Sequence, residues 1–235
     1  MNLFTEIKEK LGALVFQLNA ERQSKIFCVS FQRTGTTSVG QFFMNHRFPV
    51  ATWDVSRKNL WTRSWFDSDY EKIFHSPDFK NNVVFEDGPW ACMDFYKLLY
   101  HRFPDSKFIL FTRDPDKWFD SMISHSGGRT IGNTYRHSRI YNREIEFDEK
   151  IGENYSYAED TLDNLLEINE SHREHYKKIY LTRNNDVLNF FGRHDKSRFV
   201  HCELEDKNKW KKLGEFFHLE VDESMEVHEN ASNPK

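Results

Sequence analysis

Short apolar runs alternate along this chain with longer stretches in which apolar residues recur at helical spacing. The runs predict strands at residues 25–31, 50–53, 82–86, 107–112 and 197–202. The stretches predict helices that begin at Thr36 and at Pro115, and further helices over residues 57–76, 90–103, 157–191 and 208–218. Strands that alternate with helices form parallel sheets covered on both faces. The pattern therefore predicts an α/β fold with three layers, α/β/α, around a central parallel sheet.

Two segments differ from this alternation. Residues 1–22 carry apolar side chains at helical spacing and predict an amphipathic N-terminal helix. Residues 125–154 contain several glycines and predict a loop or lid region, because a loop of that length in a compact domain is usually functional or mobile. No apolar stretch reaches the roughly 20 residues that a membrane span needs. We expect a single domain over residues 1–235.

Composition narrows the classes of function. The chain has 33 Lys and Arg against 37 Asp and Glu, and a net charge of −4 argues against a general nucleic-acid binder. Aromatic residues make up 16% of the chain, which is typical of a folded protein with a large buried core. The odd, widely spaced cysteines Cys28, Cys92 and Cys202 predict a reducing compartment, hence a cytoplasmic location, and suggest no metal site. The sequence does not indicate an oligomeric state.

The sequence SFQRTGTTS, residues 30–38, connects the first predicted strand to the helix that begins at Thr36. A turn with glycine between a strand and a helix directs backbone N–H groups at one point, and the helix dipole attracts anions there. An ordinary turn capped by a threonine is the alternative. A nucleotide triphosphatase would have lysine where Thr36 stands and a further glycine earlier in the loop. Here Arg33 supplies the cation from inside the loop.

Arg33-Thr34-Gly35-Thr36-Thr37 resembles the 5′-phosphosulfate loop, [KR]-[ST]-G-[TS]-[TS], of sulfotransferases that use 3′-phosphoadenosine 5′-phosphosulfate (PAPS). A second resemblance is Arg113 at the end of a strand, followed eight residues later by Ser121. In the family, these two positions hold the 3′-phosphate of the nucleotide. Taken alone, Arg113 would more simply pair with Asp116 or Asp120, and Ser121 would be a solvated helix residue. The motifs are specific over residues 25–125.

The resemblance implies a P-loop NTPase-like sulfotransferase fold and an enzyme that needs no metal. PAPS would be the co-substrate, 3′,5′-ADP the product, and a small molecule or carbohydrate the acceptor. The implied nucleotide-binding residues are Arg33, Thr34, Gly35, Thr36, Thr37, Ser38, Arg113 and Ser121. One departure is that the late Arg-Lys-Gly motif of the animal cytosolic enzymes, which also grips the 3′-phosphate, is missing.

The strand at residues 82–86 ends in two carboxylates, Glu86 and Asp87. Sulfuryl transfer to a hydroxyl or amine requires a base, and in the resembling families this strand carries it. Asp87 aligns best with the catalytic position, and Glu86 is the second choice. Because side chains alternate along a strand, only one of the two is expected to face a cleft. The structural alternative is that Asp87 caps a helix that begins at Pro89.

Residues 125–143 carry Arg129 and three later arginines but no acidic residue. A solvated basic loop is the simplest interpretation. Because the segment follows the helix of Ser121, we expect a mobile lid in which Arg129 contacts a phosphate and the later arginines face the acceptor.

Two other functions stay open. The strand that ends at Asp87 also resembles the magnesium-binding strand of P-loop kinases and nucleotidases, although the loop lysine is missing. A non-catalytic nucleotide-binding protein could keep the same fold. In the sulfotransferase interpretation, Arg33 also stabilises the charge of the leaving group, so Arg33, Asp87 and Glu86 are the candidate catalytic residues.

Overall fold

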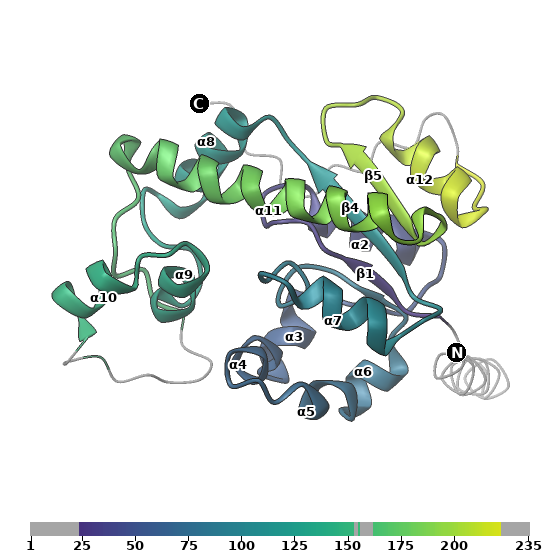
Figure 1. Cartoon of the computed structure of the whole chain (residues 1–235), viewed down its shortest axis with the longest axis horizontal. Coiled ribbons are helices and arrows are strands. Elements are labelled where there is room, and N and C mark those ends of the chain that lie inside the picture. The colour runs from purple at the N-terminus through teal and green to yellow at the C-terminus, as the bar shows by residue number, and fades with distance from the viewer. Residues whose placement is uncertain (1–23, 153–154, 156–161, 222–235) are drawn as a thin grey trace, which may run out of the picture.

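The computed structural model describes residues 24–152, 155 and 162–221 (Figure 1). The predicted amphipathic helix at residues 1–22 lies outside the described residues. Within them, no helix is long and apolar enough to cross a membrane.

A parallel sheet of five strands forms the centre of the fold, in the order β2-β3-β1-β4-β5. The strands are β1 (Ile26–Cys28), β2 (Val50–Ala51), β3 (Val84–Phe85), β4 (Lys107–Thr112) and β5 (Phe199–Glu203). Each lies within, or within a residue of, an apolar run that predicted it, and the predicted parallel α/β sheet is confirmed. β1 lies between β3 and β4, so Phe27 is in register with Phe85 on one side and Phe108 on the other.

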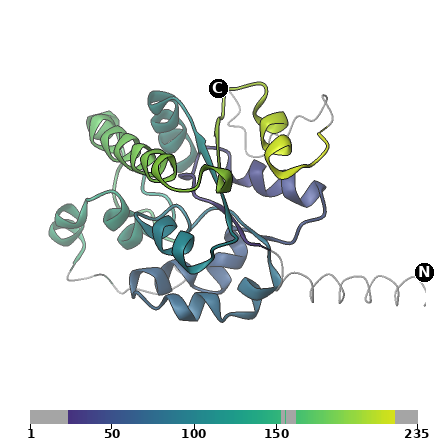
Figure 2. The same cartoon turned by 45° about the vertical axis from the view of Figure 1, so that its right-hand side comes forward.

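Helices cover both faces of this sheet, as Figures 1 and 2 show. On one face, Phe27, Phe85 and Phe108 pack against α7 (Phe95–Arg102) and α11 (Arg173–Arg193). On the other face, Cys28 and Ile109 pack against α2 (Thr36–Asn45) and α12 (Lys209–Phe217). Neighbouring residues of a strand thus belong to different cores, which is the arrangement that a sheet buried on both faces requires.

Short helices complete the first half of the chain. They are α3 (Trp53–Lys58), α4 (Trp61–Phe66), α5 (Tyr70–Phe74) and α6 (Pro77–Asn81). Residues 57–76 are therefore mostly helical, as predicted, but they are divided among α3, α4 and α5. Leu60 and Ser68 have positive φ angles of 56° and 57°, a conformation that interrupts a right-handed helix at each position. The next predicted helix also begins later than expected, because α7 starts at Phe95 rather than at residue 90.

A third core lies between α11 and α8 (Pro115–Ser126). The start of α8 confirms the sequence prediction, since the Asp114 side chain accepts hydrogen bonds from the backbone N–H groups of Asp116 and Lys117 and Pro115 follows as the first helical residue. This cap fixes where α8 begins after the end of β4.

Residues 125–154 contain more regular structure than predicted. They include α9 (Thr134–Ile140) and α10 (Glu144–Lys150), and the Asn133 side chain caps α9 by accepting from the Arg136 N–H. Gly127 ends α8 in the left-handed region, at φ 62°. The described part of this region is therefore not one long loop, because Gly127 ends α8 and two short helices follow. The lid stays a prediction.

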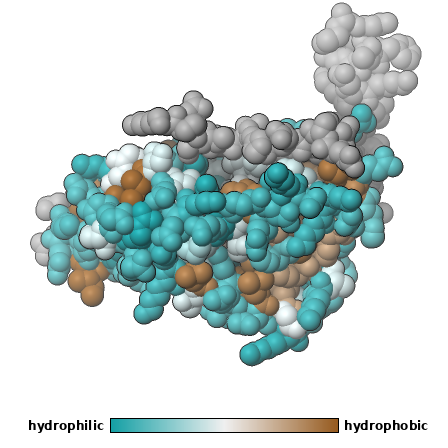
Figure 3. Space-filling view, turned by 90° about the horizontal axis from the view of Figure 1, so that it is seen from above, coloured by the Kyte–Doolittle hydropathy of each residue, from teal (hydrophilic) through white to brown (hydrophobic). Residues whose placement is uncertain are grey.

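Within the part of the chain that the structure describes, short 3₁₀ turns also occur at Glu170–His172 and Lys196–Arg198. Residues 157–161 of the segment predicted as helical lie outside the described residues, residues 162–169 are not helical, and α11 begins at Arg173. The surface seen in Figure 3 is mostly hydrophilic, with hydrophobic residues in small separate patches.

Candidate active site

A cavity of about 1310 Å³ lies where β1, β3 and β4 end. It is lined by the loop between β1 and α2, the residues after β3, α8, and the segment that includes α9. The carboxyl ends of parallel strands are the usual ligand site of an open α/β sheet. A volume above the roughly 300–1,000 Å³ of most ligand pockets leaves room for two reactants.

The loop after β1 leads directly into the N-terminus of α2. Gly35 is the residue before the helix and has φ 89°, so no side chain caps the first turn. A Cβ at Gly35 would lie 2.8 Å from Leu204 Cδ1, which adds a steric reason for glycine. The alternative of a threonine cap is wrong. The Thr34 hydroxyl instead donates to the Phe31 carbonyl at 2.5 Å and shapes the loop from within.

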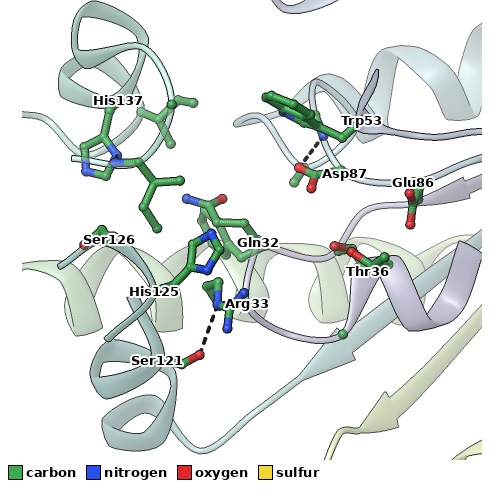
Figure 4. A pocket seen from close by; sticks show the side chains of 18 of the residues that line it. Gln32, Arg33, Thr36, Trp53, Glu86, Asp87, Ser121, His125, Ser126 and His137 are labelled. Carbon is green, nitrogen blue, oxygen red and sulfur yellow. Dashed lines mark hydrogen bonds between the residues drawn. The ribbon is translucent and has the colours of Figure 1, made fainter. Parts of the chain in front are cut away.

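The two sequence motifs meet in space. The Arg33 Nε donates to the Ser121 Oγ at 3.1 Å, as Figure 4 shows, although the residues belong to different strand–helix connections. The Trp118 indole N–H also donates to the Gln32 carbonyl at 3.0 Å and fixes α8 against the loop. Arg33, Ser121 and the start of α2 therefore surround one part of the cavity.

Arg113 lines the same part of the cavity. Its Nε donates to Glu205 Oε1 at 3.3 Å, and not to Asp116 or Asp120 as the structural alternative proposed. Those two aspartates instead pair with Arg173, and Asp116 also with Lys177. The Arg113 side chain thus extends toward the cavity rather than back along α8.

Charges of both signs meet at Arg33. Burial lowers the pKa of Arg33, the nearby Arg113 guanidinium lowers it further, and the Asp87 carboxylate raises it. Two guanidinium groups that repel each other at one end of a cavity favour an anion between them. Figure 4 shows the Asp87 carboxylate on the side of Arg33 that faces away from Ser121.

Asp87 and Glu86 both line the cavity, although strand alternation predicted only one. β3 ends at Phe85, and Asp87 has a positive φ of 62°, so strand geometry no longer governs the two side chains. Asp87 Oδ1 accepts from the Gly88 N–H at 2.7 Å. Since α7 begins only at Phe95, Asp87 does not cap a helix at Pro89.

The two carboxylates have different surroundings. Glu86 is 3% exposed and packs below α2, where a Cβ at Gly40 would lie 2.6 Å from its Oε2. Burial raises the pKa of Glu86 to about 8, and the neighbouring Asp87 carboxylate adds to the increase. Burial also raises the pKa of Asp87, whereas the Gly88 N–H and Arg33 lower it. Of the two groups, only Asp87 has the cation of the phosphate loop acting on its pKa.

The segment after α8 closes the opposite side of the cavity. Asn133 and Arg136 of this segment line it, together with His125 from the last turn of α8. Burial lowers the pKa of His125, and the charge of Arg33 lowers it further. Arg129 is exposed and is not among the residues that line the cavity. Its backbone forms an isolated antiparallel β-bridge with that of Glu167. A phosphate contact by Arg129 therefore requires a movement of this segment and stays a prediction.

His125 was not predicted as a site residue. It stands four residues after Ser121 in α8, and residues at that spacing share one face of a helix. That spacing is a signal in the sequence that identifies His125 once Ser121 is placed in the cavity. Figure 4 shows His125 beside Arg33 and Gln32.

Comparisons with known proteins support one family. Residues 25–233 match the family described as "Sulfotransferase domain". Among solved structures, the chain is similar to the sulfotransferase from Alicyclobacillus acidocaldarius, with 13% sequence identity, a TM-score of 0.43 and coverage of 88% of this chain and 87% of that chain. No curated protein matches the chain. Because the match at residues 25–233 includes most of the 235 residues, the chain belongs to the sulfotransferase domain family.

Proposed function

We propose that this protein is an enzyme that transfers a sulfuryl group from PAPS to a hydroxyl or amine of a small-molecule or carbohydrate acceptor, without a metal. The observation that carries the proposal is the hydrogen bond between Arg33 and Ser121. It joins the two motifs that the family uses for the two ends of the nucleotide, at the edge of the sheet where ligands bind.

The residues of the cavity fit a nucleotide with two anionic ends. The start of α2, with Thr36, Thr37 and Ser38, offers backbone N–H groups and a helix dipole to the 5′-phosphosulfate. Arg113 and Ser121 offer a guanidinium and a hydroxyl to the 3′-phosphate. Gly35 lets the chain turn there, and Thr34 keeps the loop in shape.

The proposed chemistry follows from charge and position. PAPS supplies an activated sulfuryl group whose sulfur–oxygen bond to phosphate breaks, with the electron pair staying on the phosphate oxygen. Arg33 and the first turn of α2 stabilise the negative charge that grows on that oxygen. Asp87 accepts the proton that the acceptor hydroxyl or amine loses as it bonds to sulfur.

Asp87 suits the role of base better than Glu86. Burial raises the pKa of Asp87, but the Gly88 N–H and Arg33 lower it and so favour the charged form that accepts a proton. Glu86 is enclosed between α2 and β3 and has a pKa of about 8, so most of it is protonated at neutral pH. The kinase alternative is disfavoured by the loop, where Thr36 stands in place of the lysine that contacts the nucleotide phosphates.

A transfer assay tests the proposal. PAPS with a labelled sulfuryl group is offered to phenols, alcohols, amines and sugars, and labelled product is separated from PAPS. We expect transfer to at least one class of acceptor, and Asp87→Asn should lower kcat by about 10²–10⁴ because the amide cannot take the proton. The affinity for 3′,5′-ADP should stay nearly unchanged in this variant.

Asp67→Asn is the matched control, because Asp67 is exposed and pairs with Arg63 away from the cavity. It should retain full activity. If Asp87→Asn remains active and Glu86→Gln does not, the base is Glu86. Nucleotide binding without transfer to any acceptor would instead favour the non-catalytic alternative.

A further inference from the structure

Glu205 pairs with the arginine that the proposed function assigns to the 3′-phosphate. Its Oε1 lies 3.3 Å from Arg113 Nε. The Glu205 side chain is 38% exposed and the Arg113 side chain is 25% exposed. Both residues line the cavity. Because a carboxylate and a phosphate bind a guanidinium through the same N–H groups, the two anions are alternatives for this position.

The backbone around Glu205 is held against the strands that build the site. The Leu204 N–H donates to the Thr112 carbonyl at 2.7 Å, one residue before Arg113. The Leu204 side chain also packs on Gly35 of the phosphate loop. On the other side of Glu205, α12 begins at Lys209. The carboxylate of Glu205 is therefore kept next to Arg113 by its backbone, while its side chain remains accessible to solvent.

The other charged residues near Arg113 either attract a phosphate or have their charge offset by a partner. Lys117 and Lys209 line the cavity there and would attract a phosphate. The lining carboxylate of Asp120 accepts from Arg173 Nη2 at 2.6 Å, which offsets its charge. Among the described residues, Glu205 is the acid that contacts Arg113.

We propose that Glu205 is a specificity-determining residue that competes with the 3′-phosphate of the nucleotide for Arg113. The proposal rests on the proposed function, since it assumes that Arg113 binds this phosphate. The Arg113–Glu205 pair is partly exposed, and such pairs contribute little, so a phosphate with two negative charges displaces the carboxylate at small cost. The competition lowers affinity for the donor and product and favours release of 3′,5′-ADP.

The experiment measures the binding of two nucleotides to four proteins, the wild type and three variants, by calorimetry at low salt. The nucleotides are 3′,5′-ADP and 5′-AMP, which lacks the 3′-phosphate. Glu205→Gln should bind 3′,5′-ADP about three- to fivefold more tightly than the wild type, the range expected for loss of a partly exposed ion pair. Its affinity for 5′-AMP should change less than twofold. The gain should shrink at high salt, where exposed charges are screened.

Glu203→Gln is the control, because Glu203 is an exposed glutamate of β5 that does not line the cavity and carries the same charge. It should bind both nucleotides as the wild type does. In the double variant Arg113→Ala, Glu205→Gln, the gain for 3′,5′-ADP should disappear.

Three results would overturn the proposal, and they have different meanings. Tighter binding of both nucleotides by Glu205→Gln would show a general charge effect. Weaker binding of 3′,5′-ADP by this variant, with 3′,5′-ADP still preferred by the wild type, would show that Glu205 holds Arg113 in place for the phosphate. A wild type with no preference for 3′,5′-ADP over 5′-AMP would refute both this inference and the proposed nucleotide.

Discussion

Arg33 lies in an anion-binding turn and has a left-handed backbone conformation. Its φ of 67° is unusual for a residue other than glycine, asparagine or aspartate, and it lies in a loop held by Trp118 and by the Thr34 hydroxyl. Strained conformations of this kind persist where the surrounding structure fixes them, often at functional sites. This geometry supports a direct role for Arg33 in catalysis.

Arg33→Ala should lower kcat by about 10²–10³, the usual loss when one group that stabilises transition-state charge is removed. Steady-state kinetics with PAPS and an active acceptor measure the effect. Arg63→Ala is the control, since Arg63 forms an exposed ion pair with Asp67. Unchanged turnover in Arg33→Ala would refute the role.

Glu86 leads to a prediction about stability and pH. Its pKa is raised from 4.5 to about 8 in the folded protein, so the folded state binds the proton more tightly than the unfolded state. The favourable contribution of this group is complete below about pH 4.5 and is lost as the pH rises toward about 8. Above that pH, a buried charge remains in the fold.

Glu86→Gln should therefore be more stable than the wild type at pH 8.5, by roughly 2–4 kcal/mol, and similar to it at pH 5. Urea unfolding at both pH values measures the difference. Glu71→Gln, at an exposed glutamate, should show no such pH dependence. If the free energies of unfolding of Glu86→Gln and the wild type differ by the same amount at pH 5 as at pH 8.5, the account is contradicted.

At the scale of elements, α9 is tied to α11 through buried side chains. His137 Nε2 lies 2.8 Å from the Tyr176 hydroxyl, and Arg143 Nη1 donates to the same hydroxyl at 2.9 Å. Burial and the charge of Arg143 lower the pKa of His137 to about 3, so this histidine is neutral. These contacts limit motion at residues 134–143. Residues 127–133 are held as well, since the Thr130 N–H donates to the Leu166 carbonyl at 2.9 Å and the Ile168 N–H donates to the Gly128 carbonyl at 2.7 Å, so a closing movement would carry the segment as a unit.

Hydrogen exchange tests the predicted lid. Protection within residues 125–143 should increase when 3′,5′-ADP is added, because a lid that closes on the nucleotide excludes water from the segment. The N–H groups of α5 provide an internal reference that should not change. Equal protection with and without the nucleotide would identify this stretch as an ordinary surface segment.

The elements that were predictable from sequence are those with local determinants. Asp114 and Pro115 specify the start of α8 by capping, and the apolar run at residues 107–112 matches β4. The breaks at Leu60 and Ser68 were not predictable, because neither residue type signals a left-handed conformation. The contact between Arg113 and Glu205 joins residues that follow the adjacent parallel strands β4 and β5 at the same edge of the sheet. These residues are far apart in sequence, so the contact depends on tertiary structure.

At the scale of the whole molecule, strand order assembles the site. β1 lies between β3 and β4, so the residues that follow these three strands meet at one edge of the sheet. Arg33, Asp87 and Arg113 are those residues, and each was a candidate from its motif alone. Their motifs were readable in the sequence, whereas the order of the strands that brings them together was not.

The central claim is that this edge of the sheet binds a nucleotide through its 3′-phosphate, and calorimetry with 3′,5′-ADP in the absence of magnesium tests it most directly. We predict that the wild type binds 3′,5′-ADP more tightly than 5′-AMP by about 1.5–3 kcal/mol, the usual contribution of hydrogen bonds to charged groups. Arg113→Ala should lose this difference while it binds 5′-AMP almost as before. Equal affinity of the wild type for the two nucleotides, or binding only of ATP with magnesium, would contradict the account.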